Sequence, residues 1–270
     1  NINIDHFNSL LTSYKKILFI SGDYPSYGGA ATNCYNLQKY YKNRGVETYG
    51  FYFHYTQNKI KIKYDEKEYY IGNVIDITKI TFKPDLIILK SPISFNLKKH
   101  FECDIFYLIG GIYKNELSNY YYNNTIGGIN NKFINWDVLK QINNSTVSFA
   151  NSIHTSDILQ YHFNIKVHLF YSTFIPLINK EITHIPDNFD TRKYEYGFII
   201  SNFNRTIKNI NNTIEFLKTK KNVILIGKES DKYKSYGFEC IDLIENDKIN
   251  DYLLEIKYIL KGILLALQIA

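Results

Sequence analysis

The chain uses one local pattern twice, and this repetition limits the folds that it can adopt. Residues 15–45 (KKILFISGDYPSYGGAATNCYNLQKYYKNRG) and residues 196–227 (YGFIISNFNRTIKNINNTIEFLKTKKNVILIG) each begin with a short apolar, β-rich run. Each then passes through a cluster of turn-forming residues and enters a helical pattern, which is typical of a βαβ unit. Two such units predict an α/β protein with two Rossmann-like domains. We expect a ligand at the loops that follow the strands, in a cleft between the domains.

The alternation of strands and helices indicates where each domain begins and ends. Most of the expected strands are continuous apolar runs, as in strands of a parallel sheet that is buried on both faces. In the first domain, residues 1–175, we expect strands at 17–21, 47–53, 86–89, 105–109, 147–150 and 167–170, and helices at 30–43 and 155–163. A stretch with two prolines and no periodicity, residues 176–195, predicts a linker. In the second domain, residues 196–270, we expect strands at 197–201, 222–226, 239–243 and 257–260, and helices at 208–218 and 248–255.

Charge and cysteine usage exclude several classes of protein. Lys and Arg number 32 against 26 Asp and Glu, a net charge of +6, and no dense basic run is present. This excess suits an anionic small ligand and does not indicate a nucleic-acid partner. The three cysteines, Cys34, Cys103 and Cys240, are scattered, so we predict no disulfide, no metal site and a reduced, cytoplasmic protein. The sequence has neither signal-peptide features nor an apolar stretch of the ~20 residues that a membrane span needs.

The loop after the first strand is a candidate binding site for a phosphate or a sugar. It contains Asp23, Tyr27, Gly28 and Gly29, and it precedes a helix whose N-terminal amides are expected to face the cleft. The loop is neither a GxGxxG fingerprint nor a P-loop. A turn that needs glycine for its conformation is the alternative interpretation. The pair Gly110 and Gly111, directly after the run IFYLI, is likewise predicted to leave room for a sugar on the acceptor side, or simply to make a turn.

The corresponding loop of the second domain predicts a diphosphate site. Arg205 and Lys208 lie three residues apart at an expected helix start, so they share one helical face. Two cations oppose the helix dipole there unless an anion lies between them. Arg offers bidentate contacts to phosphate oxygens and Lys a mobile point charge. The alternative is a solvated helix end in a lysine-rich protein. None of the histidines belongs to a Ser-His-Asp or metal-binding arrangement, so the catalytic residues stay unknown.

These segments together resemble one enzyme family. The motifs KILFISGDYPSYGGAAT, KPDLIILKSP, VSFANSIHTSDIL, FIISNFNRTIKN and NVILIG follow one another as do the landmarks of GT-B glycosyltransferases, specifically the retaining family-four group. The resemblance implies an acceptor-binding first domain and a second domain that binds a nucleotide-diphosphate sugar as substrate, with no cofactor or metal. It also implies that Lys208 and Arg205 grip the donor diphosphate, the arginine at a tighter spacing than usual, and that the sugar is transferred with retention.

One departure from the family leaves a second function open. The family's paired glutamates should follow a strand such as residues 257–260, but the chain continues KGILLALQIA. We therefore expect an incomplete second domain, from a truncated, frameshifted or naturally partial chain. The alternative function is an inactive remnant that binds a glycan, a nucleotide or a partner. A nicotinamide dehydrogenase is disfavoured because the dinucleotide fingerprint is missing. The sugar, the acceptor (glycan, lipid or protein) and a peripheral membrane contact are left open.

Overall fold

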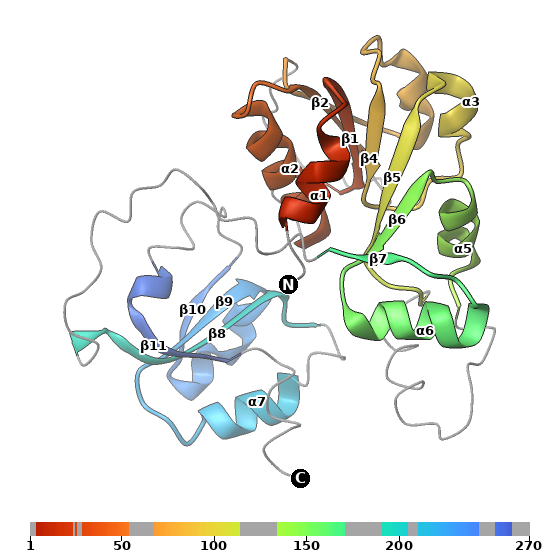
Figure 1. The fold of residues 1–270 in the computed structure, drawn as a ribbon. Coiled ribbons are helices and arrows are strands. Elements are labelled where there is room, and N and C mark those ends of the chain that lie inside the picture. Colours follow the sequence, from red (N-terminus) through yellow and green to blue (C-terminus); the bar gives the residue numbers. More distant parts are fainter. Residues whose placement is uncertain are drawn as a thin grey trace. The chain divides into compact units, whose positions relative to one another are not determined.

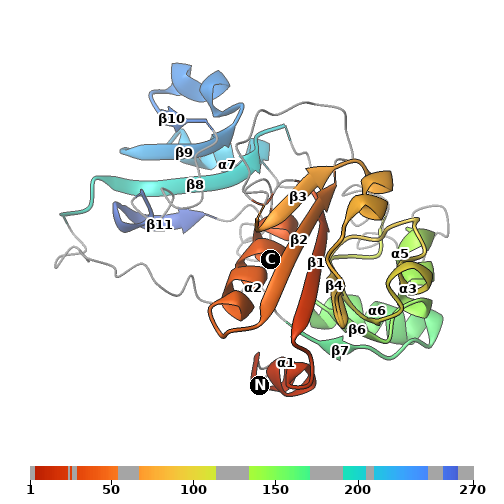
Figure 2. The same cartoon turned by 90° about the horizontal axis from the view of Figure 1, so that it is seen from above.

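The chain folds into two compact units, Asn1–Asn179 and Lys180–Ala270. The computed structural model describes residues 4–23, 25, 29–53, 67–113, 134–170, 191–204, 210–242 and 252–260 (Figures 1 and 2). Each unit contains its own parallel β-sheet and its own hydrophobic core. The prediction of two α/β domains is therefore confirmed.

The first unit is built on a seven-stranded sheet in the order β3-β2-β1-β4-β5-β6-β7. Every neighbouring pair in this sheet is parallel. The strands are β1 (Lys16–Gly22), β2 (Glu47–Phe53), β3 (Tyr69–Gly72), β4 (Leu86–Leu89), β5 (Asp104–Ile109), β6 (Val147–Ala150) and β7 (His168–Leu169). The order runs in one direction from β1 to β3 and in the other from β4 to β7. Neighbours β1 and β4 are therefore the point at which the chain reverses direction across the sheet.

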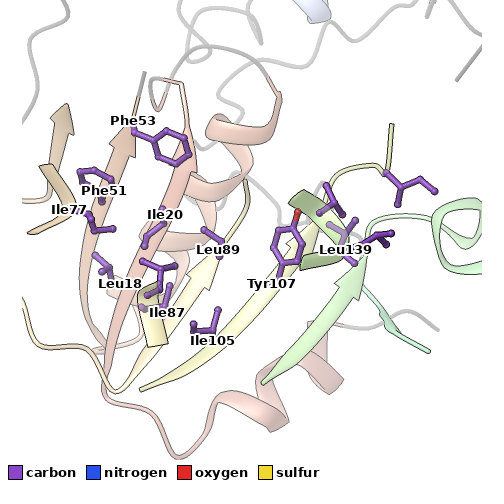
Figure 3. Packing of buried hydrophobic residues seen from close by; sticks show 14 of the residues in the cluster. Leu18, Ile20, Phe51, Phe53, Ile77, Ile87, Leu89, Ile105, Tyr107 and Leu139 are labelled. Carbon is purple, nitrogen blue, oxygen red and sulfur yellow. The ribbon is translucent and has the colours of Figure 1, made fainter. Parts of the chain in front are cut away.

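Helices cover both faces of this sheet. They are α1 (Ile4–Leu11), α2 (Gly29–Lys42), α3 (Leu97–Phe101), α5 (Trp136–Asn143), α6 (Ile153–Phe163) and the 3₁₀ helix η1 (Val74–Lys79). Side chains of β1 alternate between the two faces: Ile17 and Phe19 join the core under α1 and α2, while Leu18 and Ile20 join the core that also contains residues of η1, α3, α5 and α6. Figure 3 shows this second core. A strand with two buried faces must be apolar throughout, which explains the continuous apolar runs in the sequence.

The second unit has a four-stranded parallel sheet in the order β10-β9-β8-β11. Its elements are β8 (Tyr194–Asn202), α7 (Ile210–Leu217), β9 (Val223–Lys228), the 3₁₀ helix η6 (Ser230–Tyr236), β10 (Glu239–Ile241) and β11 (Ile256–Leu260). Apolar residues of α7 pack on one face of the sheet, together with Phe198 and Phe203. Ile256 of β11 packs on the other face. The order reverses between β8 and β11, as it does between β1 and β4 in the first unit.

The structure places most expected elements within one to three residues of their predicted ends. The elements that were not predicted include the edge strand β3 and the short helices η1, α3 and η6. They also include the first helix α1, in which the Phe7 ring stacks on Phe170 with centroids 4.0 Å apart. Residues 176–190 of the predicted linker and residues 248–251 of the helix predicted at 248–255 lie outside the described residues, while residues 252–254 are helical. The linker and the first half of that helix therefore stay predictions. Within the described ranges, no helix combines the length and the apolar character that a membrane crossing requires.

Candidate functional site

The carboxyl ends of the central strands of the first unit form a candidate binding site. In open parallel sheets, ligands bind beyond these ends at the point where the strand order reverses. The residues that follow the strands here are Asp23 after β1, Lys90 and Ser91 after β4, and Gly110 and Gly111 after β5. Three of these five residues, Asp23, Gly110 and Gly111, were predicted from the sequence.

Hydrogen bonds fix the ends of β1 and β4 to each other. The Lys90 amide donates to the Ile20 carbonyl at 2.8 Å, and the Gly22 amide donates to Ser91 Oγ at 2.9 Å. Asp23 has a φ of 66°, in the left-handed region that is uncommon for residues other than glycine. Its amide donates to the Phe53 carbonyl at 2.8 Å, so this conformation is held by the neighbouring strand β2. Uncommon backbone conformations of this kind concentrate at functional sites.

Lys90 is a lysine in the interior of the protein, with only 7% of its surface exposed. Burial lowers its pKa to about 8, because the charged ammonium loses its hydration. Its charge interacts with the Cys34 thiol of α2, whose pKa burial raises to about 12. The lowered pKa brings the titration of Lys90 towards the neutral range, next to the reversal point of the sheet.

Three glycines at this edge are not required by packing against the described residues. A Cβ built on Gly29, Gly110 or Gly111 meets no described atom within 4 Å, and none of the three has a positive φ. Gly227 of β9 is a contrasting case, because its φ is 146° and a Cβ there would lie 1.8 Å from the Ile200 carbonyl oxygen. Neither backbone conformation nor packing against the described residues explains the first three glycines. Open space for a ligand beside the backbone is consistent with them.

The end of β6 supports the turn that holds Gly110. Asn151 Nδ2 donates to the Gly110 carbonyl at 3.1 Å. The next residue, Ser152, caps α6: its Oγ accepts from the Thr155 amide at 3.1 Å. The turn after β5 and the start of α6 are thereby held together at the same edge of the sheet.

The end of β8 is the equivalent position in the second unit. The pairing of β8 with β9 shifts register between Ile199 and Asn202 and then continues, since the Phe203 amide donates to the Lys228 carbonyl at 2.9 Å. The Asn204 amide donates to Asn202 Oδ1 at 2.8 Å. From η6, Lys232 Nζ donates to the Phe203 carbonyl at 3.1 Å and to Asn204 Oδ1 at 2.5 Å. The chain that leaves β8 is thus fixed as far as Asn204.

Four of the predicted site residues lie outside the described residues: Tyr27, Gly28, Arg205 and Lys208. Their assignment stays a prediction. The described part of the chain contains no group of three or more His, Cys, Asp or Glu side chains that could hold a metal ion.

Solved structures of nucleotide-sugar proteins have the same fold. An alpha-glucosyltransferase in complex with UDP matches with a TM-score of 0.55 at 10% identity, over 92% of this chain and 73% of that chain. HepE of Anabaena, in complex with UDP and glucose, matches with a TM-score of 0.51 at 15% identity, over 90% of this chain and 68% of that chain. UDP-GlcNAc 2-epimerase of Methanocaldococcus jannaschii matches with a TM-score of 0.50 at 12% identity, over 90% of this chain and 77% of that chain. The chain has the GT-B fold.

The sequence itself shows no relationship to a known protein beyond this shared fold. No protein family description matches the chain, and no curated protein matches it. At identities of 10–15% the structural matches establish the GT-B fold and leave the reaction open.

Sequence reasoning missed four polar residues at these edges: Lys90, Ser91, Asn151 and Lys232. A usable signal existed for the first two, because Lys90 and Ser91 directly follow the apolar run LIIL at the end of a buried strand. Polar residues at the carboxyl ends of strands in an open parallel sheet lie at the edge where ligands bind. Lys232 gave no such signal, since its role depends on how η6 packs against the end of β8.

Proposed function

We propose that this protein is a glycosyltransferase that transfers a sugar from a nucleotide-diphosphate sugar to an acceptor, with retention of configuration. The observation that carries the proposal is the reversal of strand order in both sheets, at β1/β4 and at β8/β11. Such reversal points are where α/β sheets bind nucleotides and related ligands. The presence of UDP in the alpha-glucosyltransferase and HepE structures supports the same ligand class for this GT-B protein.

In this proposal, the second unit binds the donor and the first unit binds the acceptor. Arg205 and Lys208 follow the end of β8 in the sequence and are proposed to bind the diphosphate. Their charges stabilise the departing diphosphate as negative charge develops on it, which is the main requirement of a transfer without a metal ion. Gly28 and Gly29 are proposed to face the donor phosphates, and Asp23, Tyr27, Gly110 and Gly111 to line the acceptor side.

The proposal predicts the effect of removing each cation. Arg205→Ala and Lys208→Ala should each weaken UDP or GDP binding by ~1–3 kcal/mol, because each removes charge-assisted hydrogen bonds to phosphate. Calorimetric titration measures this loss, and unchanged unfolding curves serve as the control for folding. If neither substitution changes diphosphate affinity, the assignment of this loop is wrong.

A second candidate function is binding without turnover. The sequence after β11, KGILLALQIA, has no glutamate where the family resemblance expects contacts to the donor sugar. Contacts to the reacting sugar must strengthen in the transition state if they are to accelerate transfer. Release of free sugar from UDP-glucose and similar donors distinguishes the two functions. Diphosphate binding without any release or transfer of sugar supports the binding protein.

A further inference from the structure

Lys232 connects two segments at the carboxyl edge of the second sheet. It lies on η6, between β9 and β10, and its ammonium donates to two oxygens just beyond β8: the Phe203 carbonyl and Asn204 Oδ1. An ammonium group has three N–H donors. The ammonium also lies 5.2 Å from the centroid of the Tyr233 ring. Among the described residues it donates to no further oxygen, so one donor and the full positive charge remain at the end of the central strand.

The segment that Lys232 contacts is rigidly anchored. Phe203 is 2% exposed, and its ring packs against Phe198 and Tyr233 with centroids 5.4 and 5.7 Å away. Its amide is bonded to the Lys228 carbonyl at 2.9 Å. Because the Phe203 backbone is held on both sides, the lysine that bonds its carbonyl is held at a defined place. A fixed cation requires less reorganisation to bind an anion than a mobile one.

The charge of Lys232 is not neutralised by the contacts that fix it. Both of its acceptors, a carbonyl and an amide oxygen, are uncharged, and Lys232 forms no ion pair with a described carboxylate. Its neighbour Lys234 on the same 3₁₀ helix behaves differently, because its Nζ lies 2.7 Å from Asp231 Oδ1. An anionic ligand would therefore be attracted more strongly to Lys232 than to Lys234.

We propose that Lys232 belongs to the donor diphosphate site, where it holds the end of β8 and contributes a positive charge to the diphosphate. This inference rests on the proposed function and adds a residue to its site. Lysine suits the role because its charge is compact and its stem lets the remaining donor turn towards a phosphate oxygen. The position beyond β8 agrees with the rule that ligands bind at the carboxyl ends of strands where the order reverses.

The test compares diphosphates with nucleosides in matched variants. UDP, GDP, uridine and guanosine are titrated calorimetrically into the wild type, Lys232→Met, Lys232→Arg and the control Lys234→Met. Lys232→Met is expected to weaken binding of UDP or GDP ~10-fold, the effect of losing one charge-assisted hydrogen bond. The affinity for the matching nucleoside should change less than about twofold, since a nucleoside has no phosphate. Lys232→Arg should retain most of the diphosphate affinity and Lys234→Met all of it.

Two outcomes overturn the inference while the proposed function stands. One is equal diphosphate affinity in the wild type and Lys232→Met. The other is an equal loss for nucleoside and diphosphate, because that result indicates a purely structural role for Lys232. A wild type that binds neither UDP nor GDP contradicts the proposed function itself, and this inference with it.

Discussion

Lys90 combines a buried position with a charge, and this combination makes stability depend on pH. Its pKa is about 8 in the folded protein, against an ordinary value of 10.5. Between these values the unfolded chain binds more protons than the folded one, so the free energy of unfolding rises with pH. Burying the charged lysine therefore lowers the free energy of unfolding below about pH 8. This destabilisation disappears as the pH rises from about 8 to 10.5.

A comparison with Lys90→Met isolates this effect. Between about pH 7 and about pH 10, the free energy of unfolding of the wild type should rise by ~2 kcal/mol relative to the variant. Urea denaturation at several pH values measures it, and the variant serves as control for every other group that titrates. Parallel pH profiles of the two proteins would show that Lys90 has an ordinary pKa.

Glycines that face open space should respond to substitution differently from the closely packed Gly227. Gly110→Ala and Gly111→Ala should leave the free energy of unfolding unchanged or raise it by up to ~1 kcal/mol, because an added Cβ meets open space. Gly227→Ala should destabilise the second unit by more than about 3 kcal/mol, because the Cβ would overlap the Ile200 carbonyl at a positive φ. Denaturant unfolding of the three variants checks both expectations. Similar losses at all three positions would contradict this interpretation of the first two glycines.

At the scale of elements, sequence reasoning located the buried strands because burial on both faces leaves an unbroken apolar run, as in LIIL of β4. It missed β3, which is as long as β4 but has only Tyr69 fully buried, so that its residues YYIG do not form a wholly apolar run. Pairing with β2 at the sheet edge, a tertiary contact, decides that these residues form a strand. Helix α1 was missed for a similar reason, since it is stabilised by the packing of Phe7 against Phe149 and Phe170.

The candidate site was predictable only in part. The positions of Asp23, Gly110 and Gly111 follow from local order, because each comes directly after a strand. The burial of Lys90 depends on β1 and β4 being neighbours, although 63 residues of sequence separate the two strands. The contacts of Lys232 depend on packing between η6 and the end of β8. Sheet order and packing of this kind cannot be obtained from a single sequence by pattern alone.

Strand β11 exposes apolar side chains at the edge of the second sheet. Tyr258 and Ile259 are 49% and 40% exposed, and β8 is the only described strand that pairs with β11. Exposed apolar edge strands favour association between chains. Residues 261–267, which continue the apolar sequence after β11, lie outside the described residues.

This edge predicts association in the chain as given. Light scattering should show a mass that rises with protein concentration, and Ile259→Lys should reduce that rise because a charge opposes edge pairing. Lys257→Arg, a change on the same strand that preserves charge, is the matched control. A wild type that stays monomeric over the whole concentration range contradicts the prediction.

At the scale of the whole molecule, the GT-B fold provides two parallel sheets whose binding edges carry different chemistry. The first edge has Gly29, Gly110 and Gly111, at which an added Cβ would meet no described atom, beside the buried Lys90. The second has an anchored strand end with a lysine on it, followed in the sequence by Arg205 and Lys208. The net charge of +6 is in keeping with an anionic substrate. In the proposed function, the second edge binds the diphosphate of a nucleotide-diphosphate sugar and the first edge receives the acceptor.

The most direct test of this account is a calorimetric titration of the wild-type chain with nucleoside diphosphates and monophosphates. The account predicts that UDP or GDP binds at least ~10-fold more tightly than UMP or GMP, because the second phosphate gains charge-assisted hydrogen bonds. Equal affinity for the two classes, or no binding of either diphosphate, would contradict it.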